Sequence, residues 1–366
     1  MTMAFAYCPI VKGKLNDIKA VAMLARDVVP SIRPLIEFPP FLPTDKTEQV
    51  LGRFTKRMAD HLPSQACYVD FPLLKPGART SDGAPALLSA YGQLNAIAVP
   101  FEPVYGFDRD DSLWPHVIRQ ADRSGGLLLR LDPDDVDVPE ETIDKIVELK
   151  QLGLEHAMTD VMIDMRSVTS TQEALQNASS VSGFINELAA SVAVRRVIVA
   201  GSSAPKTVAG IQKDSHGIVT RGELLMWAQL ATANLRTIPI YGDYGIIHPD
   251  FSDLTMSTNI NGKIRYTEGS VVHVFRGHSL RMGNKYEQYR VLASRVINSG
   301  VYQGSTFSFG DRYIADCATG LVGTGNPGTW VHVDQNHHLT YVAKQVERLG
   351  ELARNGSSAD VVFQSA

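Results

Sequence analysis

Short apolar runs that end in a polar or charged residue recur along the first 250 residues of this chain. Each run has the length of a strand, and a longer stretch with helical spacing or a polar connection follows it. Strand-and-helix units of roughly thirty residues, eight in number, are what a (β/α)₈ barrel requires. The runs end at Lys12, Glu37, Asp70, Glu102, Asp132, Arg166, Ser203 and Asp243.

The pattern therefore predicts an α/β fold, a TIM-like (β/α)₈ barrel with parallel strands. Near-continuous apolar character is typical of strands that are buried on both faces. The longer polar connections follow strands, as expected where one face of a barrel carries elaborated loops. The longest of them, 201–217, precedes a helix expected over about 221–234. The expected strands are 7–12, 32–38, 67–71, 96–102, 126–131, 160–165, 196–200 and 238–242.

After residue 250 this rhythm changes. Residues 262–277 read as a hairpin whose turn contains Glu268-Gly269, and residues 284–300 read as an amphipathic helix. A final helix is expected over 338–356, and the last ten residues are expected to fray. We therefore expect two units: a barrel over 1–250, and an α+β extension over 251–366 that packs on it.

Composition narrows the classes of function. The formal net charge of −4 gives no strong footprint for nucleic acid. No apolar run approaches the roughly 20 residues that span a membrane, and the first residues lack a signal-peptide pattern. Cys8, Cys67 and Cys317 lack metal-ligand spacing and read as buried, reduced thiols. These features predict a cytoplasmic protein.

Four phrases resemble a known family. They are YCPIVKGK from Tyr7, IRPLIEF from Ile32, FSFGD from Phe307, and NHH at 336–338. In this order they are similar to the Beta protein family of bacterial and phage-associated proteins, over Tyr7 to about Val342. The resemblance implies a barrel, in agreement with the strand count, and a setting in phage–host conflict. No catalytic residue is carried over from it.

Charged residues near the strand ends form the candidate site. Side chains two apart share a face of a strand, so Asp160, Asp164 and Arg166 share one face. One alternative is a salt-bridge network that closes the barrel. Removing many charges from water costs several kcal/mol each unless they pair, however, so the whole set favours a ligand site. If these faces point inward, one pocket is ringed by Lys12, Glu37, Asp70, Glu102, Arg130, Asp164 and Asp243.

This set predicts a metal-assisted hydrolase of phosphoester or nucleotide-like substrates. Carboxylates suit Mg²⁺ or Mn²⁺, which polarise a phosphoryl oxygen and activate bound water. The expected metal ligands are Asp70, Glu102, Asp164 and Asp243. The expected catalytic residues are Lys12, Glu37, Arg130 and Asp164, with Lys12 and Arg130 stabilising negative charge. Phosphate or substrate is expected at Gly201, Ser202, Ser203 and Tyr105.

Two other functions fit the sequence. A lysine at the end of the first barrel strand, here Lys12, could hold pyridoxal phosphate as a Schiff base. Alternatively, the chain is a non-catalytic recognition module for a protein or nucleic-acid partner. Loops 75–85, 103–113 and 201–217 would then form the contact surface, with Tyr105, Phe107 and Trp114 as anchors.

The remaining polar candidates are expected to be structural. Of the adjacent His337 and His338, one is expected to cap the last helix and the other to be exposed. His273 and His278 are expected to line the extension. Asp311 fits the role of a turn residue as well as it fits a catalytic role.

Overall fold

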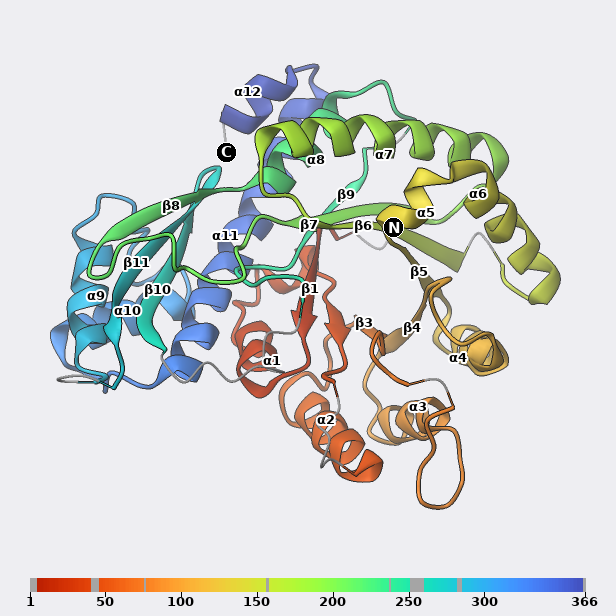
Figure 1. The fold of residues 1–366 in the computed structure, drawn as a ribbon, viewed down its shortest axis with the longest axis horizontal. Helices are drawn as coiled ribbons and strands as arrows, with labels where there is room; N and C mark the ends of the chain where they lie inside the picture. Colours follow the sequence, from red (N-terminus) through yellow and green to blue (C-terminus); the bar gives the residue numbers. More distant parts are fainter. Residues whose placement is uncertain are drawn as a thin grey trace.

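Eight parallel strands close into a barrel, which confirms the predicted fold (Figure 1). The computed structural model describes residues 5–40, 46–75, 77–155, 158–236, 238–250, 260–281 and 285–364. The strands pair in the order β1-β2-β3-β4-β5-β6-β7-β9, and β9 pairs with β1 to close the ring. Their bounds are β1 Tyr7–Lys12, β2 Leu35–Glu37, β3 Cys67–Asp70, β4 Phe101–Tyr105, β5 Leu127–Leu131, β6 Thr159–Ser167, β7 Arg196–Ser202 and β9 Ile240–Asp243.

Helices follow the strands and cover the outside of the barrel. They bury an apolar stripe against the strands, as α2 does with Val50, Phe54 and Met58. Polar residues set helix starts locally, as where the Ser170 hydroxyl accepts a hydrogen bond from the Glu173 amide and caps α7. The bounds are α1 Leu15–Ala22, α2 Thr47–His61, α3 Ala86–Ala96, α4 Trp114–Ser124, α5 Pro133–Asp137, α6 Pro139–Glu148, α7 Thr171–Ser191 and α8 Gly222–Thr232.

The inside of the barrel is a packed core with three layers. An apolar layer across the middle includes Ile10, Leu35, Leu128, Met162 and Ile198. Alternation along each strand places charged residues above and below this layer, at the two ends of the barrel. Small barrels of this kind are filled by side chains, so any ligand site must lie at one end.

Most strands differ from their expected bounds by a few residues, and two of these differences bear on the candidate site. The fourth does not start at Ala96, which is the last residue of α3, but at Phe101, and it continues to Tyr105. The eighth ends at Asp243 rather than Gly242. Both shifts change which residues lie at the strand ends.

The extension forms a three-stranded antiparallel sheet. The predicted hairpin is confirmed as β10 Asn261–Glu268 paired with β11 Val271–Ser279. The third strand, β8 His216–Thr220, comes from the connection between β7 and α8, where we expected only a loop. One face of the sheet packs on α9 Gln288–Ile297, and α10 Phe309–Thr319 packs on α9.

The last long helix ties the sheet to the barrel. α11 Pro327–Arg354 contacts α1 on one side and β10 on the other. The Asn336 side chain donates a hydrogen bond to the Ala20 carbonyl at 2.9 Å. The expected fraying of the terminus is wrong for the described residues, since α12 Ala359–Gln364 is helical and buries Val362. A boundary near residue 250 stays a prediction.

Both adjacent histidines of α11 are buried, so the expectation that one is exposed is wrong. His338 hydrogen-bonds to Asp243 at 3.0 Å, and His337 hydrogen-bonds to Asp311 at 2.9 Å. Asp311 also accepts a hydrogen bond from the Tyr266 hydroxyl at 2.6 Å. One helix thus places one histidine against the barrel and the other against the extension. Within the described ranges, no helix is long and apolar enough to cross a membrane.

Candidate active site at the barrel mouth

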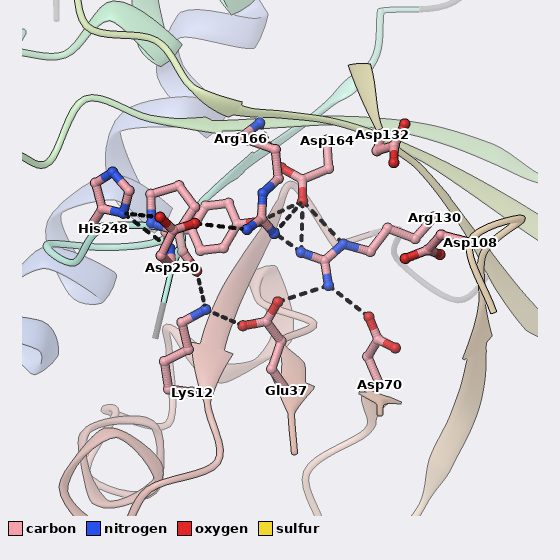
Figure 2. A network of polar contacts seen from close by, with 12 residues as sticks. Lys12, Glu37, Asp70, Asp108, Arg130, Asp132, Asp164, Arg166, His248 and Asp250 are labelled. Atoms are coloured by element: carbon pink, nitrogen blue, oxygen red, sulfur yellow. Dashed lines mark hydrogen bonds and ion pairs between the residues drawn. The ribbon is translucent and has the colours of Figure 1, made fainter. Parts of the chain in front are cut away.

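Five of the predicted charged residues converge at the carboxyl end of the barrel (Figure 2). They continue the inward-facing positions of their strands, so alternation directs all five side chains into the mouth. Each is at most 6% exposed. They are Lys12, Glu37, Asp70, Arg130 and Asp164.

Arg130 is the centre of this group. One of its terminal nitrogens donates to Glu37 at 2.8 Å and to Asp70 at 2.6 Å, and the other donates to Asp164 at 2.6 Å. Burial lowers the pKa of Arg130, but Tyr244 and the three carboxylates outweigh burial and raise it overall. The guanidinium therefore stays charged and joins three strands through three carboxylates.

Lys12 lies beside this cluster. Its amine donates to Glu37 and to the backbone carbonyl of Pro249. Burial lowers the pKa of Lys12, although the neighbouring Glu37 carboxylate opposes the shift. The amine is therefore easier to deprotonate than an exposed lysine amine.

Tyr244 also belongs to the mouth, and sequence reasoning missed it. Its hydroxyl donates to Asp164 at 2.5 Å and accepts from Arg130 at 2.7 Å. Burial raises the pKa of Tyr244 well above its usual value, so the hydroxyl stays protonated. A signal was present, because Tyr244 continues the inward alternation of Ile240 and Gly242.

Arg166 is held over the mouth by an unusual backbone. Its φ of +54° lies in the left-handed region that L-residues avoid, and the pairing of β6 with β7 is irregular between Asp164 and Ser167. Its side chain, 39% exposed, donates to the Tyr244 hydroxyl and to Asp250, each at 3.2 Å. Bulges and strained residues cluster at functional sites, because they direct a side chain where regular structure would not.

The rim of the mouth is rich in cations. Arg109 pairs with Asp70 at 3.2 Å, and Lys206 pairs with Asp250 at 2.9 Å. Lys206 hydrogen-bonds to Asp250 and lowers its pKa. The His248 side chain accepts a hydrogen bond from the Asp250 amide at 3.0 Å. Figure 2 shows His248 and Asp250 beside Arg166, on the Lys12 side of the mouth.

Glu102 does not join this site. Because β4 starts at Phe101, Glu102 lies at the amino end of the barrel, where it pairs with Arg33 at 2.8 Å and Arg195 at 2.5 Å. The prediction of Glu102 among the mouth carboxylates is wrong, since it placed the strand about five residues too early.

Asp243 and Tyr105 lie at the carboxyl end of the barrel, as expected, but their side chains face outward. The Asp243 carboxylate accepts hydrogen bonds from the Tyr7 hydroxyl at 2.5 Å and from His338 at 3.0 Å. Tyr105 packs against Trp114 with ring centroids 4.7 Å apart. Their predicted places in the pocket are wrong, because each residue is the direct neighbour of an inward-facing residue, Val104 or Tyr244, and so points to the opposite face of its strand. Tyr105 and Trp114 are also buried, which removes them as anchors for a partner.

The residues expected to bind phosphate do not form a binding site at the mouth. A side chain at Gly201 would meet Val168 and Glu223, on the outer side of β7. Ser202 faces inward, but its hydroxyl donates to the Ile247 carbonyl at 3.0 Å. Ser203 lines a separate cavity beside the barrel. The turn after β7 therefore presents no open phosphate cradle to the mouth.

The mouth does not fit the expected Mg²⁺ or Mn²⁺. Glu37, Asp70 and Asp164 each already hydrogen-bond to Arg130, which lies where a shared cation would have to lie. No group of three or more His, Cys, Asp or Glu side chains in the described parts of the chain could hold a metal ion. A cofactor aldehyde at Lys12 fits no better, because that amine is held by Glu37 and the Pro249 carbonyl.

Solved structures similar to this chain are distant barrel enzymes. A type I 3-dehydroquinate dehydratase from Clostridium difficile aligns with a TM-score of 0.39 and 10% identity, over 69% of this chain and 88% of that one. The catalytic module of a family 98 glycoside hydrolase from Streptococcus pneumoniae aligns with a TM-score of 0.40 and 11% identity, over 66% and 46%. Triosephosphate isomerase from Bartonella henselae aligns with a TM-score of 0.34 and 9% identity, over 65% and 91%.

No curated protein matches the sequence. The model of one family, described as Beta protein, matches residues 7–344. That range includes all eight barrel strands, the three-stranded sheet and most of α11. The chain therefore belongs to the Beta protein family.

Proposed function

We propose that the barrel mouth is the active site of a hydrolase for small anionic substrates of the phosphoester or nucleotide-like class. The observation behind this proposal is Arg166, a strained and partly exposed cation above the Tyr244–Asp164 hydrogen bond. A purely structural ion network gains nothing from a residue in the left-handed region. Arg166 would bind the substrate anion in place of Asp250.

The buried side chains would transfer protons without a resident metal. Asp164 would accept a proton from the attacking water as its oxygen bonds to phosphorus. As the bond to the leaving oxygen breaks, the ammonium of Lys12 would donate a proton to that oxygen, which suits its lowered pKa. Arg130 would hold Asp164 and Glu37 in place, and the Tyr244 hydroxyl would orient Asp164.

Turnover of chromogenic phosphoesters tests this proposal. We would assay 4-nitrophenyl phosphate and bis(4-nitrophenyl) phosphate in EDTA, comparing wild type with Asp164→Asn. The matched control is Asp160→Asn, on the same strand and face but at the other end of the barrel. We expect Asp164→Asn to lower kcat at least a hundredfold and the control to change it less than threefold, with circular dichroism showing both folded.

Other outcomes would contradict the proposal in different ways. Activity that EDTA removes would show that a metal does the chemistry. Equal losses in both variants would mean that the effect is on folding. If neither phosphoester is turned over, the recognition-module alternative gains, and partner capture would replace the assay.

A further inference from the structure

A cavity lies between the barrel and the three-stranded sheet, beside the mouth. It opens to solvent, and its empty space is about 450 Å³ when the open solvent at its entrance is counted with it. The connection after β7 and the start of α8 form the barrel side, together with Gly245 and Ile246 after β9. The sheet side is formed by one face of β8, β10 and β11. The mouth network does not use this space.

The sheet side of the cavity is positively charged. Lys263 and Arg265 of β10 line it, and Arg276 is the cross-strand partner of Lys263. Arg265 is paired with Asp334 at 3.2 Å, but the Lys263 amine has no hydrogen-bond partner among the described residues. Burial and the two neighbouring arginines lower the pKa of Lys263 to about 8, against the opposing effect of Asp334. An acceptor group on a ligand would relieve this cost.

The barrel side offers a hydrogen-bond acceptor. Glu223, near the start of α8, is 3% exposed, and its Oε2 atom is buried without a hydrogen-bond partner. Its other oxygen accepts from Arg221 at 3.3 Å and from the Tyr241 hydroxyl at 3.4 Å. Burial raises the pKa of Glu223, and the Arg221 guanidinium opposes this shift. A donor group on a ligand would satisfy Oε2.

The walls between these two polar ends are apolar. They are formed by Val208, Val219, Val272 and Val274, with Pro205 and Ile246. Small-molecule sites commonly combine such walls with a few polar groups that fix orientation. Branched aliphatic groups fit walls of this kind.

We propose that this cavity binds a short branched aliphatic carboxylate that also carries an α-amino or α-hydroxyl group. The carboxylate would lie against Lys263 and Arg265, the donor group would reach Glu223 Oε2, and the aliphatic group would pack on the valines. This site is separate from the proposed phosphoester chemistry and does not depend on it.

Calorimetric titration of the full chain tests the site with four probes. L-leucine and 2-hydroxyisocaproate carry both polar groups, isocaproate lacks the donor, and isoamylamine lacks the carboxylate. We expect binding of the first two, with isocaproate at least fivefold weaker and isoamylamine not bound. Lys263→Met should weaken leucine binding at least tenfold, whereas the exposed Lys150→Met, with the same charge change, should leave it unaltered.

A second variant keeps the test decisive if Lys263→Met folds poorly. Val272→Phe keeps every charge and fills the cavity, so it should abolish binding while circular dichroism stays native. The proposal is overturned if none of the four probes binds wild type. It is also overturned if leucine binds equally well to wild type, Lys263→Met and Val272→Phe. If isocaproate binds as tightly as leucine, the proposed contact between the donor group and Glu223 is wrong.

Discussion

The two ends of this barrel both hold buried charges, but they are built differently. At the amino end, Asp160 is surrounded by Arg195 at 2.6 Å, Arg196 at 3.2 Å and the Tyr68 hydroxyl. The same Arg195 also pairs with Glu102. Several arginines on backbone of ordinary conformation thus neutralise two carboxylates. At the carboxyl end, one buried arginine, Arg130, is shared by three carboxylates, two of which also pair with a second cation, Lys12 or Arg109.

The difference teaches which charges are structural. The arginines of the amino end close the barrel floor, where this fold places residues for stability. The carboxyl end adds features that closure does not need: a lysine whose pKa is lowered and a strained, partly exposed arginine. Charge at a strand end alone does not separate the two cases, but backbone strain and the sharing of one buried cation by three carboxylates do.

The largest expected effect is on stability at the carboxyl end. Arg130→Met leaves three buried carboxylates without their shared cation, so we expect a loss of about 3–5 kcal/mol in the free energy of unfolding. Urea denaturation followed by circular dichroism measures it. A loss no larger than that of Arg195→Met, which removes a partly exposed cation from two carboxylates, would show that the two ends do not differ in this way.

A smaller loss is expected at the amino end. Asp160→Asn removes the charge that Arg195 and Arg196 share, but both arginines are partly exposed and regain water. We therefore expect a loss of about 2 kcal/mol in the free energy of unfolding, by the same denaturation. Destabilisation greater than that of Arg130→Met would reverse the proposed ranking of the two ends.

The smallest expected effect is the difference in stability between a glycine and an alanine variant, and it should have opposite signs at the two ends of the barrel. At Arg166, with φ of +54°, glycine should be more stable than alanine by about 1 kcal/mol, because only alanine strains the left-handed backbone. At Arg196, at the start of β7, alanine should be more stable than glycine by about 0.5 kcal/mol. Thermal unfolding of the four variants compares them. The same sign at both positions would remove the argument that strain marks the mouth.

Much of the fold was accessible from the sequence because strand periodicity is local. The first strand, Tyr7–Lys12, was predicted with its observed bounds. Alternation within strands placed Lys12, Glu37, Asp70, Arg130 and Asp164 on inward faces, and the structure brings them together.

The errors came from strand ends and long-range pairing. Glu102 lies on the same inward face of β4 as Val104. Whether Glu102 lies at the amino or the carboxyl end of the barrel depends on where β4 starts. Asp243 differs from Tyr244 by one position, which decides whether a side chain meets His338 outside or Arg130 inside. β8 has no partner nearby in the sequence and becomes a strand by pairing with β11, more than 50 residues later.

The sequence by itself determined the eight-stranded barrel, the hairpin and the inward charges, because hydrophobic alternation acts between neighbouring residues. Only the tertiary structure decided which charges share an end, which carboxylates pair with Arg130, and how a strand from the β7 connection encloses a cavity beside the barrel. These features depend on register and on contacts between residues far apart in the chain, where a shift of one residue reverses the direction of a side chain.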